Sequence, residues 1–341
     1  MKDTFELVIS NTEEVVTKEE VREILESRRS FNFYYGTAPT GPFHFAYLVP
    51  LTKLMQLAEV GGKGTVLIAD YHAYLDDRKT PFELMDLRSR YYEMCIRALL
   101  GPYADRIRFV RGSSYQHKRD YVEDLYLVAG LVTAVRAKRA ATEVVRMKEE
   151  AKVSELLYPL LQILDVKYLK ADITVGGTDQ RKIYMLGREV LPEIGFKSGS
   201  YLFTPLLPSL RGGGSKMSAS DPLSHIRVTD PPDDIRTKID KAYCPQGSVD
   251  QNPITSTAKL IIFPRTGTLT VRRKEKFGGD VTFNSYAELE SAYISGQLHP
   301  QDLKRAVADY LVDVLAPARD ISDREPELLQ ELERSWATQG S

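Results

Sequence analysis

A pentapeptide that follows a run of glycines carries side chains that can act on phosphate. Residues 212–214 are all glycine, and the lysine, methionine and serines that follow them are Lys216, Met217, Ser218 and Ser220. Three glycines make a flexible hinge, so a lysine just beyond them can swing onto a polyphosphate, where the serine hydroxyls add donors. The alternative is a solvated glycine–serine loop whose lysine has no role.

A second candidate phosphate site is the segment from Gly36 to Tyr47, which runs from an expected strand into an expected helix. Small residues such as Thr40 and Gly41 let a ligand approach the backbone. A new helix also presents free N–H groups and the positive end of its dipole. His44, expected in the first helical turn, adds a donor. The alternative is an ordinary tight turn with a surface histidine.

A third candidate is a helix face that carries three different polar groups. Tyr158, Gln162 and Asp165 stand at i, i+4 and i+7, so they share one side of a helix among leucines and isoleucines. A hydroxyl, an amide and a carboxylate are costly to bury without partners, which favours a ligand-binding role. The alternative is a polar helix edge that faces solvent.

The elements that must position these groups form an α/β pattern. Apolar strands separated by helical stretches are expected at 34–36, 65–69, 107–110 and 172–175. This alternation predicts a parallel sheet with helices on both faces. Ligands of such sheets lie beyond the carboxyl ends of the strands, so Gly36, Asp70 and Gly177 are expected at the edges of a site.

The second part of the chain has a different pattern of expected secondary structure. After about residue 225 we expect helices near 233–242, 255–262, 286–295 and 301–314, with no convincing long strand. We therefore expect an α/β domain over 1–225 and a helical domain over 226–330. The sequence from about residue 318 looks poorly ordered, and 331–341 are assigned to a tail.

Composition narrows the class of protein. A chain of 341 residues with 43% apolar content suits two domains, and its 46 basic and 47 acidic side chains nearly cancel. No apolar stretch is long enough for a membrane span. The N-terminus carries acidic residues where a signal peptide would carry basic ones. The two cysteines lack metal-ligand spacing. These features predict a soluble, intracellular protein.

The three candidate sites together resemble class I aminoacyl-tRNA synthetases. Residues 216–220 match that family's Lys-Met-Ser-Lys-Ser signature, with Ala219 at its fourth place. The segment at His44 is similar to its His-Ile-Gly-His signature, with Ala46 and Tyr47 in place of glycine and histidine. Residues 157–183 resemble the tyrosine-binding segment of archaeal and eukaryotic cytoplasmic tyrosyl-tRNA synthetases nearly residue for residue. Further matches at 69–75, 241–245, 276–280 and 299–304 extend the resemblance over about 5–316.

The resemblance implies a Rossmann-like catalytic domain and an all-helical anticodon-binding domain. It also implies a cytoplasmic enzyme that activates L-tyrosine with ATP and transfers it to the 3′-terminal ribose of tRNA-Tyr. Tyr34 and Asp165 would then bind the phenolic hydroxyl. The α-ammonium group would be held by Tyr158, Gln162 and Gln180, with His72 at the pocket edge. The nucleotide would take Gly36, Thr40, Gly41, His44, Tyr47 and the 216–220 loop, and Mg²⁺ would arrive with ATP rather than in a protein metal site.

The resemblance also assigns contacts to tRNA. A helical insertion over about 115–155 carries a basic patch, in which Arg139 corresponds to a reader of the first base pair. The same insertion is expected to contribute to a homodimer. Phe277, which stands beside basic residues, would stack on an anticodon base. Asp302, with His299 nearby, would read the first anticodon base. The alternatives are a solvated basic face and, for Asp302, a helix cap after Pro300.

Three other functions remain possible at this point. A tryptophanyl-tRNA synthetase has the same fold, although Tyr34 with Asp165 suits a phenol better than an indole. A catalytically inactive RNA-binding relative is disfavoured by the complete set of candidate residues. A nucleotidyltransferase that does not use tRNA is disfavoured by the basic helical second domain.

Overall fold

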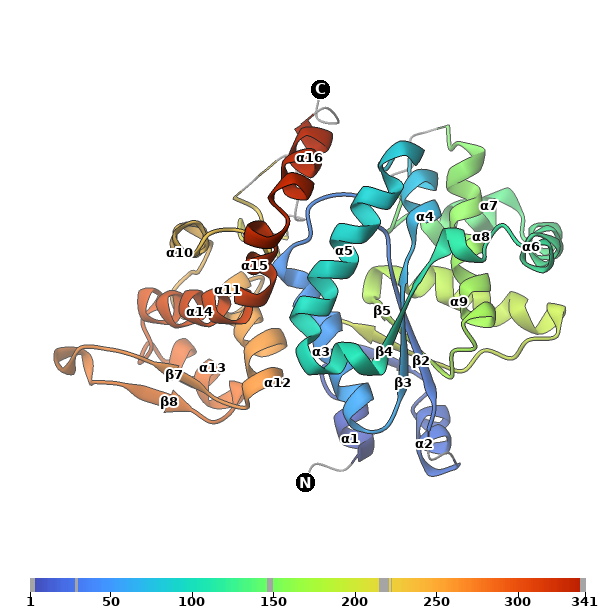
Figure 1. Cartoon of the computed structure of the whole chain (residues 1–341). Helices are drawn as coiled ribbons and strands as arrows, with labels where there is room; N and C mark the ends of the chain where they lie inside the picture. Colours follow the sequence, from blue (N-terminus) through green and yellow to red (C-terminus); the bar gives the residue numbers. More distant parts are fainter. Residues whose placement is uncertain (1–3, 28–29, 146–149, 215–220, 222, 338–341) are drawn as a thin grey trace.

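The chain folds around a six-stranded sheet in the order β1-β6-β5-β2-β3-β4. The computed structural model describes residues 4–27, 30–145, 150–214, 221 and 223–337 (Figure 1). β1 is antiparallel to β6, and the other neighbours pair in parallel, which confirms the predicted α/β fold. The strands are β1 (Glu14–Val16), β2 (Asn32–Thr37), β3 (Lys63–Ile68), β4 (Ile107–Arg111), β5 (Ile173–Gly177) and β6 (Ser200–Thr204).

Alternating side chains on the strands build two separate cores. In β2, Phe33 and Tyr35 belong to the same core as residues of α3 (Leu48–Glu59) and α5 (Met85–Leu100), whereas Tyr34 belongs to a second core with residues of α8 (Val153–Tyr168) and α9 (Arg181–Val190). Figure 1 shows these two pairs of helices on opposite sides of the sheet. Tyr34 therefore faces the helix that carries Asp165. The helices of this part are α1 (Thr4–Ile9), α2 (Lys18–Ser27), α3 (Leu48–Glu59), α4 (Asp70–Leu75), α5 (Met85–Leu100), α6 (Arg119–Leu131), α7 (Ala134–Ala141), α8 (Val153–Tyr168) and α9 (Arg181–Val190).

The C-terminal part is mainly helical, but it is not all-helical as expected. A two-stranded antiparallel hairpin, β7 (Leu269–Val271) and β8 (Val281–Phe283), lies among its helices. Each strand has only three residues, which is too short for a hydrophobic period to show in the sequence. The helices are α10 (Pro232–Lys241), α11 (Pro253–Thr257), α12 (Phe263–Thr266), α13 (Tyr286–Ile294), α14 (Pro300–Val314), α15 (Ala316–Arg324) and α16 (Pro326–Ala337).

The prediction of a poorly ordered tail is wrong for residues 318–337. α15 and α16 occupy this stretch, and Leu328 and Leu332 are buried. The ring of Trp336 lies 5.6 Å from that of Tyr91 in α5, edge to face. These helices have a charged surface on one side and an apolar face on the other, and the apolar face packs on the α/β part of the chain. Residues 338–341 lie outside the described part of the chain.

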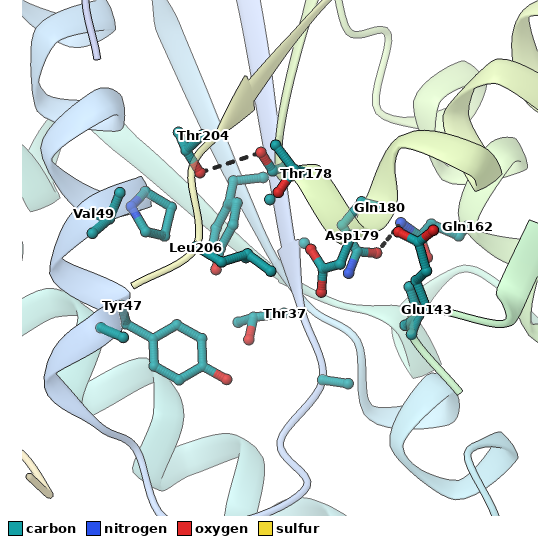
Figure 2. Close-up of a pocket in the computed structure, with 18 of the residues that line it drawn as sticks. Thr37, Tyr47, Val49, Glu143, Gln162, Thr178, Asp179, Gln180, Thr204 and Leu206 are labelled. Carbon is teal, nitrogen blue, oxygen red and sulfur yellow. Dashed lines mark hydrogen bonds between the residues drawn. The ribbon is translucent and has the colours of Figure 1, made fainter. Parts of the chain in front are cut away.

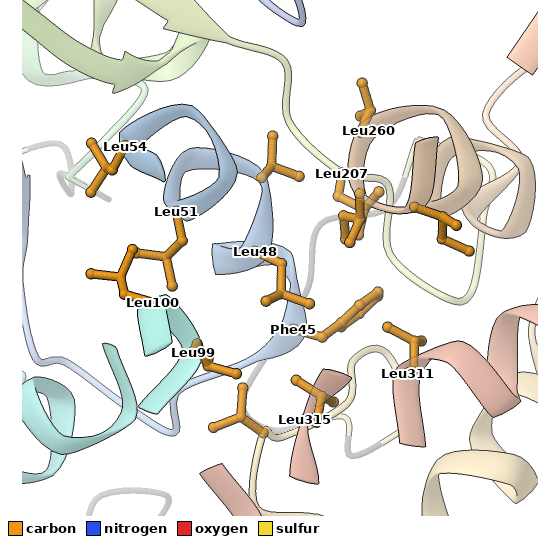
Figure 3. Close-up of a cluster of buried hydrophobic side chains, with 14 of the residues drawn as sticks. Phe45, Leu48, Leu51, Leu54, Leu99, Leu100, Leu207, Leu260, Leu311 and Leu315 are labelled. Carbon is orange, nitrogen blue, oxygen red and sulfur yellow. The ribbon is translucent and has the colours of Figure 1, made fainter. Parts of the chain in front are cut away.

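The two parts of the chain share one continuous core. Phe45, Leu48 and Leu99 from the first part meet Leu207, Leu260, Leu311 and Leu315 (Figure 3). Arg265 of α12 donates to the Thr52 hydroxyl at 3.1 Å and to the Leu99 carbonyl at 3.3 Å. The helical part therefore packs directly behind the helix that follows the His44 turn. Within the described ranges, no helix is long and apolar enough to cross a membrane.

Candidate active site

A cavity of about 740 Å³ opens at the carboxyl ends of β2, β5 and β6, between the two helical layers (Figure 2). Parallel sheets present their ligand sites at this edge. Tyr47 and Thr37 face Asp179 and Gln180 across the hollow. The predicted site residues that line it are Tyr34, Gly36, Thr40, His44, Tyr47, His72, Tyr158, Gln162, Asp165, Gly177 and Gln180.

Tyr34 lies at the buried end of this cavity. Its ring is 1% exposed and folds back over Gly36, where an added Cβ would lie 2.5 Å from the Tyr34 hydroxyl oxygen. Burial, helped by nearby Tyr184 and Asp165, raises the pKa of Tyr34 well above its usual value. The phenol therefore keeps its proton and can both donate and accept a hydrogen bond.

Asp165 presents two carboxylate oxygens in different environments. Oδ1 accepts from the hydroxyl of Tyr115 at 2.6 Å, the amide of Gln116 at 2.8 Å and the hydroxyl of Tyr121 at 3.0 Å. Oδ2 is buried and has no hydrogen-bond partner among the residues that the structure describes. Because an unpaired buried carboxylate oxygen is costly, Oδ2 is the atom at this end of the cavity with the strongest demand for a donor.

The pKa of the Asp165 carboxyl group lies near neutral pH. Burial raises the pKa of Asp165 to about 7, although the three donors to Oδ1 pull it down. His72 Nε2 lies 3.7 Å from Oδ2, which is too long for a hydrogen bond. Burial lowers the pKa of His72 to about 3, so its ring is neutral at pH 7 and forms no ion pair with Asp165.

Two glutamines and a tyrosine line the wall beside Asp165. The Gln162 amide donates to the Gln180 side-chain carbonyl at 2.9 Å, which fixes both side chains (Figure 2). Tyr158 lies edge to face against His72, with ring centroids 4.8 Å apart. The helix face predicted from i, i+4 and i+7 spacing is buried, so the solvent-facing alternative for this face is wrong.

The other wall is built from the turn after β2. Tyr47 stacks on Phe43 with ring centroids 4.0 Å apart. His44 is extended and caps a short 3₁₀ turn (Phe45–Tyr47), so its expected place within the first helical turn is wrong. The chain after β6 holds this segment, because Phe45 N donates to the Ile226 carbonyl and Val228 N to the Phe43 carbonyl. Burial and the nearby His225 lower the pKa of His44 to about 3, which makes it a neutral donor.

The glycine run lies at the mouth of the same cavity. Gly212, Gly213 and Gly214 all have positive φ, which L-residues other than glycine rarely adopt, and Gly214 lines the cavity. Arg211 forms a two-point ion pair with Asp221, at 2.9 and 3.0 Å, which closes the base of the loop. The predicted phosphate residues Lys216, Met217, Ser218 and Ser220 lie between these points, outside the described residues.

Two predicted site residues do not line the cavity. Gly41 lies in the turn without reaching it, and the Asp70 side chain serves the neighbouring loop. Asp70 Oδ1 accepts from the backbone N–H of Tyr71 and of Ser113, and Oδ2 accepts from the Ser113 hydroxyl. Asp70 thus holds the turn Gly112–Ser114, which directly precedes Tyr115 and Gln116.

The sequence analysis missed four residues that surround Asp165 or Tyr34. Tyr115 and Gln116 follow the carboxyl end of β4, so the rule for parallel sheets provided a signal for them. Tyr121 and Tyr184 lie on helix faces with no such signal, since buried aromatic residues are usually core. Only the tertiary fold brings them to the site, where the Tyr121 hydroxyl donates to Asp165 and Tyr184 lines the cavity.

None of the candidate tRNA residues lines the cavity. Arg139 is exposed on α7, the helix that leads to the cavity residues 142–144. Phe277 is 59% exposed, and Lys276 Nζ lies 4.9 Å from its ring centroid. His299 caps α14 by accepting from Gln301 N, so the alternative in which Asp302 is the helix cap is wrong. Among the described residues no cluster of three His, Cys, Asp or Glu side chains is arranged to hold a metal ion.

Comparisons with known proteins agree with this geometry. The family described as tRNA synthetases class I (W and Y) matches residues 26–316. The tyrosine–tRNA ligase of Haloarcula marismortui is 44% identical over 336 residues, which cover 96% of each chain. The cytoplasmic tyrosine–tRNA ligase of Danio rerio is 42% identical over 93% of this chain and 60% of that protein. The crystal structure of tyrosyl-tRNA synthetase complexed with L-tyrosine from Archaeoglobus fulgidus has a TM-score of 0.89 at 46% identity, covering 93% of this chain and 98% of that one. The chain therefore belongs to the class I tRNA synthetases and, within them, to the tyrosine–tRNA ligases of the archaeal and eukaryotic cytoplasmic type.

Proposed function

We propose that the cavity binds L-tyrosine and ATP side by side and joins them into tyrosyl-adenylate. The tyrosine carboxylate attacks the α-phosphorus of ATP, a P–O bond forms, and the bond to the departing pyrophosphate breaks. Catalysis of this kind rests on positioning and on stabilising the phosphoryl oxygens. The product then passes its tyrosyl group to the 3′-terminal ribose of tRNA-Tyr, and the described residues suggest no general base for that step.

The unpaired Oδ2 of Asp165 carries the amino-acid half of this proposal. A ligand phenol reaching the cavity end would meet this acceptor together with the protonated Tyr34 hydroxyl. Phenylalanine would leave the buried Oδ2 of Asp165 unpaired and would offer the Tyr34 hydroxyl no ligand partner, so it should be rejected strongly. Tyrosyl-tRNA synthetases are the standard example of this kind of discrimination. An indole N–H satisfies only an acceptor, which disfavours tryptophan.

The α-ammonium group of the ligand would lie against the polar wall. Tyr158, Gln162 and Gln180 supply a hydroxyl and two side-chain carbonyls there, and the Gln162–Gln180 hydrogen bond keeps them in place before the ligand arrives. Pre-formed acceptors of this kind bind a cation without the cost of ordering flexible side chains.

The opposite wall is proposed to hold ATP. Thr40, His44 and Tyr47 line it, and Lys216 is proposed to reach the phosphates from the glycine loop. His44 is neutral, so Lys216 would supply the positive charge, and His44 one N–H donor. Mg²⁺ is proposed to enter as the counter-ion of ATP, because phosphate oxygens are its usual ligands at nucleotide sites.

The tRNA contacts are proposed at three places. Arg139 on α7 would meet the acceptor end, since the chain after that helix lines the cavity. Phe277 is proposed to stack on an anticodon base, because its ring is exposed beside the Lys276 ammonium. Asp302 in the first turn of α14, with His299 as its cap, is proposed to read the first anticodon base.

A homodimer is proposed through the helical insertion. Large apolar side chains on α6 and the start of α7 are open to solvent, namely Tyr126 (70% exposed), Leu127 (57%), Leu131 (43%) and Val135 (70%). Several large apolar side chains exposed on neighbouring turns of the chain favour a subunit interface.

Charging of a tRNA-Tyr transcript with labelled tyrosine tests the whole proposal. We expect tyrosyl-tRNA to form with ATP, and tryptophan to give no product under the same conditions. Charging with tryptophan in place of tyrosine would move the assignment to the sister enzyme. Tyrosine activation without any charging would favour a nucleotidyltransferase that does not use tRNA.

A further inference from the structure

The carboxylate of Asp165 is held by a cluster of donors that the proposed ligand would not touch. This donor cluster consists of Tyr115, Gln116 and Tyr121, which all hydrogen-bond to the same oxygen, Oδ1. The Tyr121 hydroxyl has one proton and also lies 2.9 Å from the Leu161 carbonyl, so it serves Oδ1 only in part. Tyr115 and Gln116 therefore provide the two dedicated donors.

The donor cluster is itself rigidly supported. Asp70 binds the backbone and hydroxyl of Ser113, which fixes the turn just before Tyr115. A Cβ on Gly112 would lie 2.5 Å from Gln116 Oε1, so only glycine allows the Gln116 side chain its place. The Tyr115 and Tyr121 rings meet edge to face at 5.6 Å. Neither the donors nor Oδ1 can rotate toward the cavity without breaking these contacts.

We propose that Tyr115 and Gln116, supported by Tyr121, are positioning residues for substrate selection, which occupy Oδ1 of Asp165 and leave Oδ2 as the single oxygen that meets the ligand hydroxyl. A carboxylate held at one oxygen cannot swing to compensate when the ligand lacks a hydroxyl. The free-energy cost of binding phenylalanine, which leaves Oδ2 unpaired, is then not reduced by movement of the carboxylate. This inference rests on the proposed binding of tyrosine at Asp165.

The same donor cluster controls when Asp165 is charged. The other groups that face the carboxylate are Tyr34 from β2, Asp70 and His72 from α4, and Tyr184 from α9. Burial raises the pKa of Asp165 most and Asp70 raises it further, whereas the donors to Oδ1 lower it. Removing a donor should therefore raise the pKa of Asp165 further and leave less carboxylate at pH 7.

The variant Tyr115→Phe tests this role because it removes one hydroxyl and keeps the ring. Tyr168→Phe is the matched control, since the Tyr168 hydroxyl binds the carboxylate of Asp124 at 2.8 Å and its ring packs on Tyr121 at 4.7 Å. The measurement is kcat/KM for ATP–pyrophosphate exchange with tyrosine and with phenylalanine, at pH 7.0 and 8.5. Melting temperatures are recorded for each protein.

We expect Tyr115→Phe to reduce the ratio of kcat/KM for tyrosine over phenylalanine about tenfold at pH 7.0, with partial recovery at pH 8.5. Recovery follows because higher pH restores the carboxylate. Tyr168→Phe should keep the wild-type ratio at both pH values. Gln116→Met, which removes the second dedicated donor, should act in the same direction as Tyr115→Phe and provides the test if the first variant does not fold.

Asp165→Asn separates failure of this inference from failure of the proposed site. If Asp165→Asn loses selection while Tyr115→Phe and Gln116→Met keep the wild-type ratio and pH profile, the positioning role is overturned. An equal loss in Tyr115→Phe and Tyr168→Phe without pH recovery also overturns it, because that result indicates general loosening. If Asp165→Asn itself keeps full selection for tyrosine, the proposed tyrosine site fails and the positioning role with it.

Discussion

The hydroxyl of Tyr34 occupies the space that a side chain on Gly36 would need, because a Cβ there would lie 2.5 Å from the hydroxyl oxygen. Glycine is required at this position for close approach rather than for an unusual backbone angle, since Gly36 lies within β2 in regular parallel pairing. The same two residues therefore shape the end of the cavity. This contact explains the need for glycine at position 36 better than the binding of a phosphate does.

Gly36→Ala should displace the Tyr34 phenol and weaken tyrosine binding. We expect KM for tyrosine to rise by about tenfold or more, because a buried hydrogen bond worth about 1–2 kcal/mol is misplaced. Gly41→Ala is the control in the same turn, since its added Cβ has nothing within 4 Å. Steady-state exchange at saturating ATP measures both. Equal KM values in the two variants would contradict the role given to the Tyr34–Gly36 contact.

Asp165→Asn should lower activity, and it should make the protein more stable than the wild type as the pH rises. Burial raises the pKa of Asp165 to about 7 from an ordinary 3.8, so the native state binds its proton more tightly than the unfolded chain does. This group's contribution to the free energy of unfolding is therefore full below about pH 4 and is lost as pH rises to about 7. Asparagine has no such dependence.

We accordingly expect the melting temperature of Asp165→Asn, relative to the wild type, to increase between pH 5 and pH 8. In the same interval kcat/KM for tyrosine should rise in the wild type, as the carboxylate forms, and stay low and flat in the variant. Thermal melts and exchange assays across this range measure both quantities. A wild-type rate that falls from pH 6 to pH 8 would show that the protonated acid is the active form.

Lys216→Met should remove the proposed positive charge from the phosphates and keep the length of the side chain. We expect kcat for exchange to fall at least a hundredfold, with KM for tyrosine changed by less than about threefold, because the charge acts on the transition state. Lys63→Met is the control, since Lys63 is exposed at the amino-terminal end of β3, away from the cavity. An unchanged kcat in Lys216→Met would exclude the loop lysine from the chemistry.

Phe277→Ala should affect tRNA and leave amino-acid activation intact. Stacking of a base on an aromatic ring contributes about 1–3 kcal/mol, so KM for tRNA in charging should rise roughly 5- to 100-fold. Exchange without tRNA should stay at the wild-type rate. Ile294→Ala, another exposed apolar residue of the C-terminal part, should change neither. A wild-type KM for tRNA in Phe277→Ala would remove the stacking role.

Val135→Asp should dissociate the proposed dimer. Val135 is 70% exposed in the isolated chain, and a charge buried in an apolar interface is strongly unfavourable. Sedimentation velocity should show a dimer for the wild type and a monomer for the variant. Ile294→Asp, with similar exposure on the C-terminal part, should remain dimeric. A wild-type protein that sediments as a monomer at micromolar concentration would refute the dimer.

Sequence patterns predicted four of the six strands of the α/β part, because these four carry runs of apolar residues. The strand near Tyr34 and the strand before Gly177 appear where expected, and the polar face of α8 points into the cavity. The short strand β1 was not predicted, because three residues carry no clear period. β6 was not predicted either, because the polar residues Ser200 and Thr204 at its ends leave an apolar run of only three residues.

The donor cluster around Asp165 marks the limit of prediction from the sequence. Tyr121 is 44 positions from Asp165 along the chain, and only the packing of α6 on α8 brings them together. Asp70 shows the reverse case, since its place after β3 suggested the cavity while its hydrogen bonds serve the turn at Ser113. A strand end places a residue near a site, but local hydrogen bonds decide which way its side chain turns.

Amino-acid-dependent ATP–pyrophosphate exchange tests the central claim most directly. The purified protein should exchange pyrophosphate when tyrosine is supplied, and phenylalanine and tryptophan should each give a far lower kcat/KM, because neither satisfies both buried groups at the cavity end. No exchange with tyrosine, or equal exchange with tyrosine and phenylalanine, would contradict the account of Tyr34 and Asp165 as the groups that select the substrate.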